Sequence, residues 1–264
     1  MDIIINSLNN AKIKSVIALN KAKERKKTHS FTVEGIKMID EVPSDWKINQ
    51  IFVSEQFIKK NNKYLDKFIP KGIEIVKVSD QIFKHISDTV APQGIKAVVF
   101  EKKHEINDII NNENPLIIMV ENLQDPGNLG TIIRTADAVN ADGIILSCGT
   151  VELYNPKVIR STMGSIFHLP IVCYQDLNEV IPLLKEKDIM TFATHLKGSV
   201  YPYSLDLTKG CAMIIGNEGN GISDEIANKT DMYVKIPMLG KAESLNAAMA
   251  AGIVMYEAVR QRIE

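Results

Sequence analysis

The chain contains 264 residues, of which 45 % are hydrophobic and 24 % are charged, and its formal net charge is −1 at pH 7. This composition excludes fibrous, low-complexity and disordered proteins, and the length suits one or two globular domains. Because the net charge is close to zero, a nucleic-acid partner would have to bind a local basic surface of the protein.

The first predicted element is a lysine-rich helix that begins near Asn9 and carries Ile13, Val16 and Ile17 at helical spacing. A dense run of basic residues follows it, with Glu24 as a counter-charge. Such a run can neutralise phosphate groups, although an ordinary solvated helix face has the same composition. The candidate nucleic-acid-binding residues of this run are Lys21, Lys23, Arg25, Lys26 and Lys27.

Apolar runs alternate with helical patterns through the rest of the first hundred residues. The predicted strands cover residues 31–33, 48–53, 73–78 and 95–100. Helices are predicted near residues 36–42 and 80–87, and polar helices are predicted between the strands. This order predicts a small α/β domain over residues 1–103, and the charged, Asn-rich residues 104–114 are interpreted as a linker.

After Pro115, continuous β-branched runs predict strands that are buried on both faces. These runs cover residues 116–120, 144–146, 190–193, 212–215 and 232–236. Because helical patterns separate them, we predict an α/β domain over residues 115–264, with a mostly parallel sheet and helices on both faces. In a sheet of this kind, ligands bind at the carboxyl ends of the strands.

Cysteine and histidine spacing gives no sign of a metal site. Cys148, Cys173 and Cys211 are odd in number and lack a C-x-x-C pair, which fits a reducing compartment, and the histidines are scattered. The N-terminus lacks the features of a secretory signal, and the longest weakly polar run, residues 245–254, is too short to span a bilayer. We therefore expect a cytoplasmic protein that binds neither a metal nor a membrane.

The first of three polar loops, residues 121–130, follows the first strand of the predicted parallel sheet. Asn128 is expected to cap the next helix. Arg134 lies away from the apolar stripe of that helix, so its guanidinium can face the loop end of the sheet. The alternative is a turn that is merely rich in Asn and Gly, followed by a surface arginine.

The second loop, residues 216–221, contains three glycines, which allow backbone groups to approach a ligand closely. Its glycine spacing differs from the dinucleotide-binding fingerprint. Asp224 and Glu225 lie at the start of the next helix, where they would repel a phosphate. A cofactor that lacks phosphate, such as S-adenosylmethionine, therefore suits this loop better.

The third loop, residues 236–246, leads into a run of small side chains at residues 247–252. Ser244 is expected to cap the following helix, and Asn246 is expected to lie in its first turn. The alternative interpretation is a closely packed core helix with a good cap. Because the three polar loops follow three strands of one sheet, they can converge on one pocket.

At these residues the chain resembles the SpoU (TrmH) family of RNA ribose 2′-O-methyltransferases, within the SPOUT superfamily. The resemblance covers residues 116–264 through N-x-x-D-P-x-N-x-G-x-x-x-R, G-N-E-G-x-G and I-P-M-x-G-x-x-x-S-L-N, in the family's order. The N-terminal part resembles the RNA substrate-binding domain often attached to these enzymes, through residues 21–27, 31–35 and 92–95. This second match favours RNA as the partner of the basic run.

The resemblance implies a deep trefoil knot in the C-terminal domain, S-adenosylmethionine as the cofactor, and a homodimer that forms through this domain. The positions that match the family's cofactor site are Gly216, Ile236 and Leu245, with Thr194 and Met238 as further contacts. The positions that match its methyl-transfer site are Asn128, Arg134, Glu218, Ser244 and Asn246.

The implied reaction moves a methyl group in line from a sulfonium to a ribose 2′-hydroxyl, so alignment supplies much of the rate. Because an arginine pKa above about 12 makes a poor proton acceptor, we expect Arg134 to hold the adjacent phosphate and stabilise the developing alkoxide. Glu218 is expected to organise its loop and Asn128, not to act as the base. Ribosomal RNA is the expected substrate. The open alternatives are ribose methylation of transfer RNA, methylation of a base, and a non-catalytic ribosome-assembly protein that binds RNA.

Overall fold

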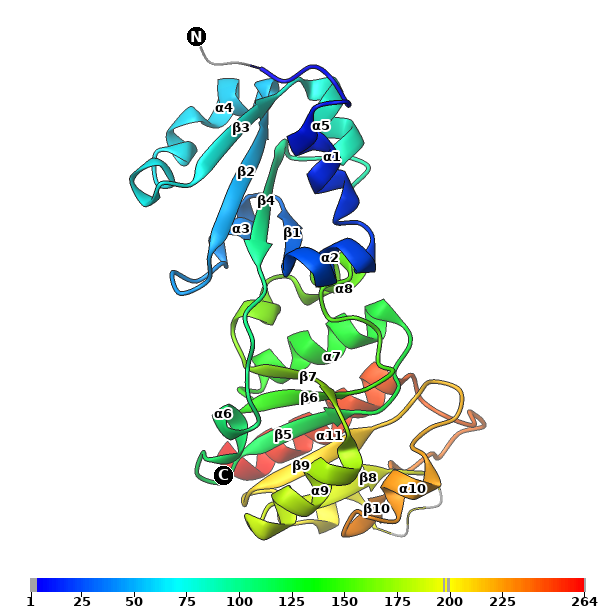
Figure 1. The fold of residues 1–264 in the computed structure, drawn as a ribbon. Helices are drawn as coiled ribbons and strands as arrows, with labels where there is room; N and C mark the ends of the chain where they lie inside the picture. The colour runs from blue at the N-terminus through cyan, green and yellow to red at the C-terminus, as the bar shows by residue number, and fades with distance from the viewer. Residues whose placement is uncertain (1–3, 197, 199, 264) are drawn as a thin grey trace. The chain divides into compact units, whose positions relative to one another are not determined.

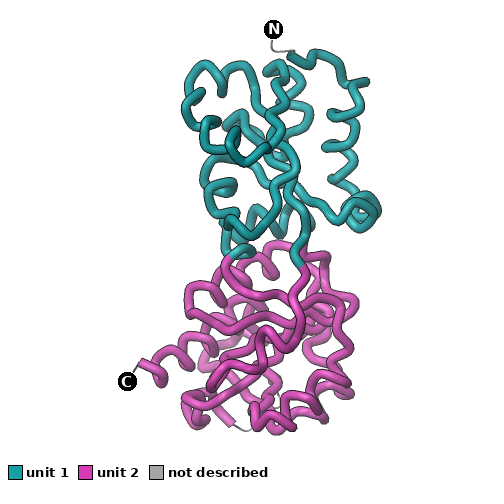
Figure 2. The backbone as a smooth tube through the Cα atoms, turned by 60° about the vertical axis from the view of Figure 1, so that its left-hand side comes forward, with its two compact units in different colours: residues 1–102, 154–167 teal, residues 103–153, 168–264 magenta. Residues whose placement is uncertain are grey.

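The computed structural model describes residues 4–196, 198 and 200–263 and divides the chain into two compact units (Figure 1 and Figure 2). Unit 1 contains Met1–Lys102 and Tyr154–Phe167, and unit 2 contains Lys103–Leu153 and His168–Glu264. A segment that follows the first strands of unit 2 in the sequence therefore belongs to unit 1, and the chain passes between the units three times.

Unit 1 is built on a mixed sheet. Its strands are β1 (Ser30–Glu34), β2 (Ile48–Ser54), β3 (Glu74–Val78) and β4 (Ile95–Phe100), in the spatial order β1-β4-β2-β3. β4 runs antiparallel to β1 and β2, whereas β2 and β3 run parallel. Its helices are α1 (Ala11–Ala18), α2 (Ala22–Thr28), α3 (Ile36–Asp40), α4 (Glu55–Leu65), α5 (Asp80–Ile86) and α8 (Pro156–Thr162), with the 3₁₀ helices η1 (Ile69–Lys71) and η2 (Ser165–Phe167). Apart from the lysine-rich helix, the strands and helices predicted for this part of the chain are confirmed.

The predicted lysine-rich helix is two helices in the structure. Asn10 begins α1, because its side chain accepts a hydrogen bond of 2.9 Å from the backbone N–H of Lys12. Ile13 and Val16 are buried from α1 in a cluster with residues of α5 and the sheet. The basic run lies on α2, which ends at His29 in a left-handed conformation. The apolar stripe and the basic surface therefore come from separate helices.

Four aromatic side chains hold residues 154–167 within unit 1. Phe31 of β1 stacks on Tyr154 with ring centroids 4.5 Å apart, and Trp46 meets Phe167 edge to face at 4.9 Å. Phe31 is fully buried, and Trp46 is 8 % exposed. Aromatic pairs of this geometry contribute roughly 0.5–1.5 kcal/mol each beyond the burial of their area. A chain that ended at residue 102 would lose these contacts.

Unit 2 is built on a parallel sheet, as predicted. Its strands are β5 (Leu116–Val120), β6 (Gly143–Ser147), β7 (Ile171–Gln175), β8 (Met190–Thr194), β9 (Cys211–Ile215) and β10 (Met232–Val234), in the order β10-β8-β9-β5-β6-β7. Neighbouring strands run parallel. The sequence did not predict β7, an edge strand in which only the first two residues, Ile171 and Val172, are buried.

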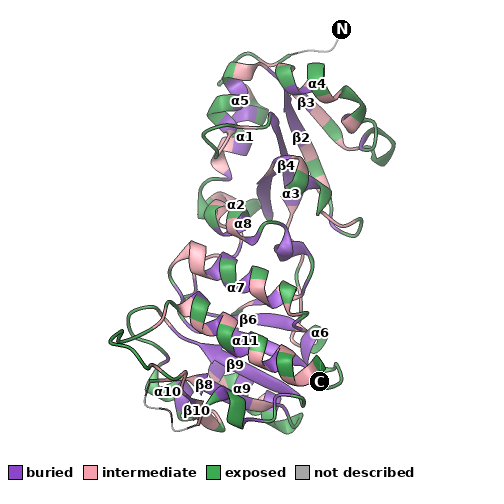
Figure 3. Cartoon of the chain, turned by 180° about the vertical axis from the view of Figure 1, so that it is seen from behind, coloured by how far each residue is buried: buried purple, intermediate pink, exposed green. Residues whose placement is uncertain are grey.

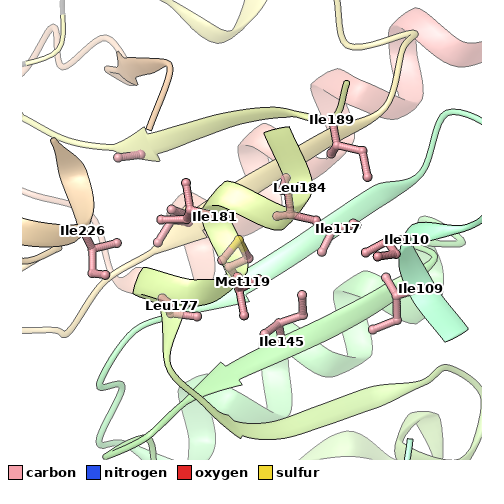
Figure 4. Close-up of a cluster of buried hydrophobic side chains, with 14 of the residues drawn as sticks. Ile109, Ile110, Ile117, Met119, Ile145, Leu177, Ile181, Leu184, Ile189 and Ile226 are labelled. Carbon is pink, nitrogen blue, oxygen red and sulfur yellow. The ribbon is translucent and has the colours of Figure 1, made fainter. Parts of the chain in front are cut away.

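Helices cover both faces of this sheet. On one face, α6 (Asn107–Ile110), α9 (Leu177–Glu186) and α10 (Asp224–Ala227) pack against side chains of β5 and β6, as Figure 4 shows for Met119, Ile145 and Ile181. On the other face lie α7 (Pro126–Ala138) and α11 (Ala247–Ile263), which pack against each other (Figure 3). The remaining short element is η3 (Pro202–Ser204).

The segment interpreted as a linker, residues 104–114, contains α6. Ile109 is fully buried and Ile110 is 3 % exposed, and both belong to the apolar cluster under α9. These two residues form a short apolar island in a polar segment, which is why composition alone favoured a linker. The segment therefore contributes to the core of unit 2.

The strand order places the candidate loops together. β6 follows β5 on one side of it, whereas β9 returns on its other side, so the order reverses between β5 and β9. Val120 pairs with Ile215 in the register of these strands, and the N–H of Glu121 donates to the Ile215 carbonyl at 2.9 Å. The first and second loops thus leave the sheet side by side, at the position where parallel sheets bind ligands.

Among the described residues, no helix is long and apolar enough to cross a membrane. The same part of the chain contains no group of three or more His, Cys, Asp or Glu side chains that could hold a metal ion.

The packing of β6 against α6 makes Gly143 sensitive to substitution. A Cβ atom at this position would lie 2.5 Å from Cδ1 of Ile109 and 3.0 Å from the carbonyl oxygen of Pro170. We expect Gly143→Ala to lower the free energy of unfolding by about 1–3 kcal/mol, the usual cost of overpacking. Urea unfolding followed by circular dichroism would measure this loss.

Gly252→Ala is the matched control, because its nearest atom outside the helix backbone would be Cγ2 of Thr135 at 3.8 Å, an ordinary contact. Alanine stabilises a helix by roughly 1 kcal/mol relative to glycine. Equal unfolding midpoints for the Gly143 variant and the unmodified protein would contradict the proposed steric origin.

Candidate functional site

A cavity of about 900 Å³ lies at the carboxyl ends of β8, β9 and β10. Its walls come from residues 194–196 after β8, residues 215–224 after β9, and residues 234–250 around the start of α11. The predicted cofactor residues that line it are Thr194, Gly216, Ile236, Met238 and Leu245. The three segments are distant in sequence, so only the tertiary fold brings these side chains to one cavity.

The loop after β9 doubles back on itself. Asn217 and Gly221 exchange two backbone hydrogen bonds of 2.9 Å, and Gly221 has a positive φ of 70°. Gly216 lies so close to the backbone of Gly221 that a Cβ atom would collide with it. The glycines therefore serve the tight return of the loop, which leaves its backbone along the cavity wall.

Among the described residues, the charged side chains that line the cavity are mostly negative. Glu218, Asp224 and Glu243 line it, whereas Lys235 is the opposing cation in its wall. A phosphate-bearing ligand would be repelled by this surface, and a ligand with a positive centre would be attracted. The charged side chains of the cavity therefore fit S-adenosylmethionine, which carries a sulfonium and no phosphate.

Hydrogen bonds between side chains connect the three loops. The Nδ2 of Asn246 donates to Oδ1 of Asn128 at 2.9 Å, and the Nδ2 of Asn128 donates to Oε1 of Glu218 at 3.0 Å. These residues belong to the third, first and second loops, respectively. The predicted convergence of the loops is thus observed in the structure, with Asn128 as the central partner.

Glu218 is held as an anion by the first loop. Burial alone would raise its pKa, but the amide of Asn128 and the backbone N–H groups of Asp125 and Gln124 donate to the carboxylate and lower the pKa below its usual value. The backbone donors lie 2.9 Å from Oε1 and 3.1 Å from Oε2. A carboxylate with a lowered pKa is a weak proton acceptor near neutral pH.

Two expected helix caps are wrong. Asp125, not Asn128, caps α7, because its Oδ1 accepts from the N–H of Asn128 at 2.8 Å and Pro126 follows in the first turn. Asn246, not Ser244, caps α11 by accepting from the N–H groups of Ala248 and Met249 at 3.0 and 3.2 Å. Both corrections have the same cause, since each helix starts at a different residue from the one we expected.

These corrections change what the side chains do. Because Asp125 satisfies the backbone of α7, the amide of Asn128 is available for Glu218 and Asn246. Asn246 has two tasks, because its Oδ1 caps α11 while its Nδ2 reaches Asn128. Ser244 lies outside the helix and lines the cavity.

Arg134 lies apart from these contacts. Its side chain is exposed on α7, on the side away from the buried Leu129, Ile132, Ile133 and Ala136. Unlike Glu218, Ser244 and Asn246, it does not line the cavity, and neither does Asn128. Within the described part of the chain, Arg134 has no hydrogen bond or ion pair, so its guanidinium can bind an incoming group.

The sequence did not identify Glu121 as part of the site. This carboxylate is 6 % exposed, and it accepts from the N–H and Oγ of Ser223 at 2.9 and 2.6 Å, which fixes the start of α10 to the end of β5. A buried carboxylate requires hydrogen-bond donors. An acidic residue directly after a buried strand therefore indicates that a donor from another segment lies beside it, and this signal was present in the sequence at Glu121.

The basic run is only partly available to a ligand. Lys21, Lys23, Lys26 and Lys27 are exposed on or beside α2. Arg25 is 2 % exposed, and its Nη1 donates to the Leu19 carbonyl at 2.7 Å. The expectation that Arg25 faces RNA is therefore corrected, because its guanidinium is used to join α2 to the end of the preceding helix.

Comparisons with known proteins agree with this site. The model of the SpoU rRNA Methylase family matches residues 115–256, and the model of the MRM3-like substrate binding domain matches residues 10–97. The 23S rRNA (guanosine(2553)-2′-O)-methyltransferase RlmP of Bacillus subtilis is 32 % identical over 252 residues, which are 96 % of this chain and 97 % of that protein.

Solved structures give the same result. The AdoMet-bound rRNA methyltransferase from Sinorhizobium meliloti is 33 % identical with a TM-score of 0.87, over 98 % of this chain and 97 % of that one. The SpoU methyltransferase AviRb from Streptomyces viridochromogenes, in complex with AdoMet, is 30 % identical with a TM-score of 0.88, over 97 % and 98 %. With motifs, cavity and fold in agreement, this chain belongs to the SpoU rRNA methylase family.

Proposed function

We propose that this protein is an S-adenosylmethionine-dependent methyltransferase that methylates a ribose 2′-hydroxyl in ribosomal RNA of the 23S type. The observation that carries the proposal is the hydrogen-bonded series from Asn246 through Asn128 to Glu218, which lies beside an acidic cavity suited to a sulfonium. RlmP and AviRb, whose names describe them as methyltransferases of this kind or of this family, support the choice of reaction.

The cavity residues would bind and orient the cofactor. Gly216 and the backbone around Ile236 and Leu245 would hold it, while Thr194 and Met238 would complete the walls. The bound cofactor supplies an electrophilic methyl group. The protein aligns the ribose with it, and this alignment accounts for much of the rate enhancement of a two-substrate reaction.

The polar residues at the cavity have separate roles in this proposal. Glu218 orders the first loop as an anion, and Asn128 and Asn246 fix that loop relative to α11. Arg134 would bind the phosphate next to the target ribose and stabilise the developing alkoxide, since its exposed guanidinium is available. Ser244 would contact the ribose from the third loop.

Unit 1 would bind the RNA through Lys21, Lys23, Lys26 and Lys27, each of which can neutralise one phosphate. We take residues 1–103 as the substrate-binding domain and residues 115–264 as the methyltransferase domain, with residues 104–114 between them. The match of residues 10–97 to a substrate-binding domain supports this division. The presence of Asn128, Arg134, Glu218, Ser244 and Asn246 together favours an enzyme over a non-catalytic scaffold, which has no physical need for all five.

The exposed side of α11 supports a homodimer through the C-terminal domain. Met249, Ile253 and Tyr256 are 60, 41 and 56 % exposed at helical spacing, and the last two line a groove of about 310 Å³ with Tyr203 of η3. Apolar residues gathered in this way commonly mark a subunit interface. We also propose that the C-terminal segment is knotted and that the protein works in the cytoplasm.

Incubation of the purified protein with methyl-labelled S-adenosylmethionine and total RNA tests the proposed reaction. The label is expected in large-subunit ribosomal RNA at a single nucleotide that resists alkaline cleavage, because a 2′-O-methyl group blocks attack by the ribose oxygen. Calorimetry with the cofactor alone is the parallel measurement. Label in transfer RNA or on a base would redirect the substrate assignment, and absence of cofactor binding would refute the proposal.

Substitution of Arg134 tests the role of its guanidinium. Arg134→Lys keeps the positive charge but loses the planar pair of donors that binds a phosphate, so we expect kcat to fall by about tenfold or more. Arg134→Ala should fall further, while calorimetry with S-adenosylmethionine should give the same affinity in both variants, because Arg134 does not line the cavity. Near-normal turnover of Arg134→Lys would exclude recognition by the planar donor pair.

Substitution of Glu218 tests whether this residue orders the loop or acts as the base. Glu218→Gln removes the anion that accepts hydrogen bonds from three donors, so kcat should fall. The dependence of kcat on pH, measured from about 6 to about 9, should stay the same, because Glu218 is not the base in this proposal. Unchanged kcat at neutral pH combined with an altered pH profile would contradict the ordering role.

The same variant has a pH-dependent effect on stability. Because the pKa of Glu218 is lowered in the folded protein, its stabilising contribution is present above its ordinary pKa and is lost as the pH falls through the lowered value. The difference in Tm between the unmodified protein and Glu218→Gln should therefore be largest near pH 7 and disappear in acid. Thermal unfolding at a series of pH values measures it.

A further inference from the structure

A residue outside the predicted site joins the catalytic loops to a neighbouring turn. We propose that Gln124 is a positioning residue, which fixes the first loop, and through it Glu218 and Asn128, to the turn at residues 148–151. This inference rests on the proposed methyltransferase function. In this proposal Gln124 contacts neither the cofactor nor the RNA.

The backbone at Gln124 sets the position of the Glu218 carboxylate. The N–H of Gln124 donates to Oε2 at 3.1 Å, and the N–H of Asp125 donates to Oε1 at 2.9 Å. Both oxygens of the carboxylate are thus oriented by two successive peptide groups. A rotation of this short piece of backbone would move Glu218 and, through the next hydrogen bond, the amide of Asn128.

The side chain of Gln124 holds that piece of backbone in place. Although Gln124 is an exposed residue, its Nε2 donates to two carbonyls, those of Asn122 and Gly149, each at 2.8 Å. The Asn122 carbonyl also accepts from Nδ2 of Asn217 in the second loop at 2.8 Å. Asn122 has a positive φ of 52°, which is uncommon for a residue other than glycine. Its carbonyl thus accepts hydrogen bonds from a side chain of the first loop and from a side chain of the second loop.

The end of β6 and the turn that follows it are paired with the first loop at further points. The N–H of Asn122 donates to Oγ of Ser147 at 2.9 Å, and the N–H of Val151 donates to the Leu123 carbonyl at 2.8 Å. The Leu123 carbonyl and the Gln124 N–H belong to one peptide group, so this group is bonded both to Val151 and to Glu218. The bond from the Gln124 side chain to Gly149 ties the same piece of backbone to the turn at a second point.

The turn leads directly into the segment that belongs to unit 1. Leu153 is the last residue of this stretch of unit 2, and Tyr154 begins residues 154–167, which pack within unit 1 through the aromatic contacts described above. Gly149, the partner of the Gln124 side chain, therefore lies a few peptide bonds before the chain that packs in the proposed RNA-binding unit. A loose turn would affect the alignment of the ribose more than the binding of the cofactor.

The variant Gln124→Met tests the proposal, because methionine keeps the length of the side chain and removes both donors. We expect kcat for methyl transfer to ribosomal RNA to fall by about 10- to 100-fold, the range that a misplacement of about 1 Å can produce. The Kd for S-adenosylmethionine should stay within about twofold and the Tm should stay the same. Hydrogen exchange should rise at the amides of residues 124–125 and 149–151 and at no distant element.

Gln175→Met is the matched control. The Nε2 of Gln175 also donates to the carbonyl two residues before it, that of Cys173 at 2.7 Å, but within the described part of the chain its side chain makes no second hydrogen bond. This variant should retain normal kcat. Equal kcat for the unmodified protein and Gln124→Met would overturn the proposal, as would a loss of kcat that accompanies an equal loss of Tm and cofactor affinity.

The two proposals fail in different ways. If the proposed function is wrong, the unmodified protein transfers no methyl group, and the hydrogen-exchange measurement still tests the positioning role. If only the inference is wrong, the unmodified protein is active, and Gln124→Met shows neither the fall in kcat nor the local increase in exchange.

Discussion

The carboxylate of Glu218 is the group on which the candidate site depends. It accepts hydrogen bonds from the backbone of Gln124 and Asp125 and from the side chain of Asn128, which in turn accepts from Asn246. An anion in this position costs little because three donors compensate its charge. The loops after β5 and β9 and the start of α11 therefore form one hydrogen-bonded unit beside the cavity.

The parallel sheet makes this arrangement possible. Because the strand order reverses between β5 and β9, their carboxyl ends are neighbours, and the loops that follow them meet without long excursions. The same reversal places Glu121 beside Ser223, whose contact fixes α10. The site thus lies at the end of the sheet, where a small number of hydrogen bonds sets the geometry of groups from distant parts of the sequence.

Electrostatics divides the work between the two units. The near-zero net charge of the chain conceals an acidic cavity in unit 2 and a basic helix in unit 1. The first suits a cationic cofactor and the second suits a polyanion. Since residues 154–167 belong to unit 1 although unit 2 surrounds them in the sequence, the two surfaces are joined by three chain crossings, and unit 1 cannot be cut out as a simple N-terminal fragment.

The sequence by itself determined the class of fold and the convergence of three polar loops. Continuous apolar runs are sufficient to identify strands buried on both faces, and the polar loops that follow such strands lie at one edge of a parallel sheet. The resemblance to the SpoU family, carried by the motifs of these loops, singled out Asn128, Glu218 and Asn246. Only the tertiary structure decided which residue caps each helix, that Arg25 is buried, that α6 joins the core, and that residues 154–167 pack with unit 1. These features depend on contacts between residues distant in sequence, which local patterns of polarity do not record; the pairing of Gln124 with Gly149 is of the same kind.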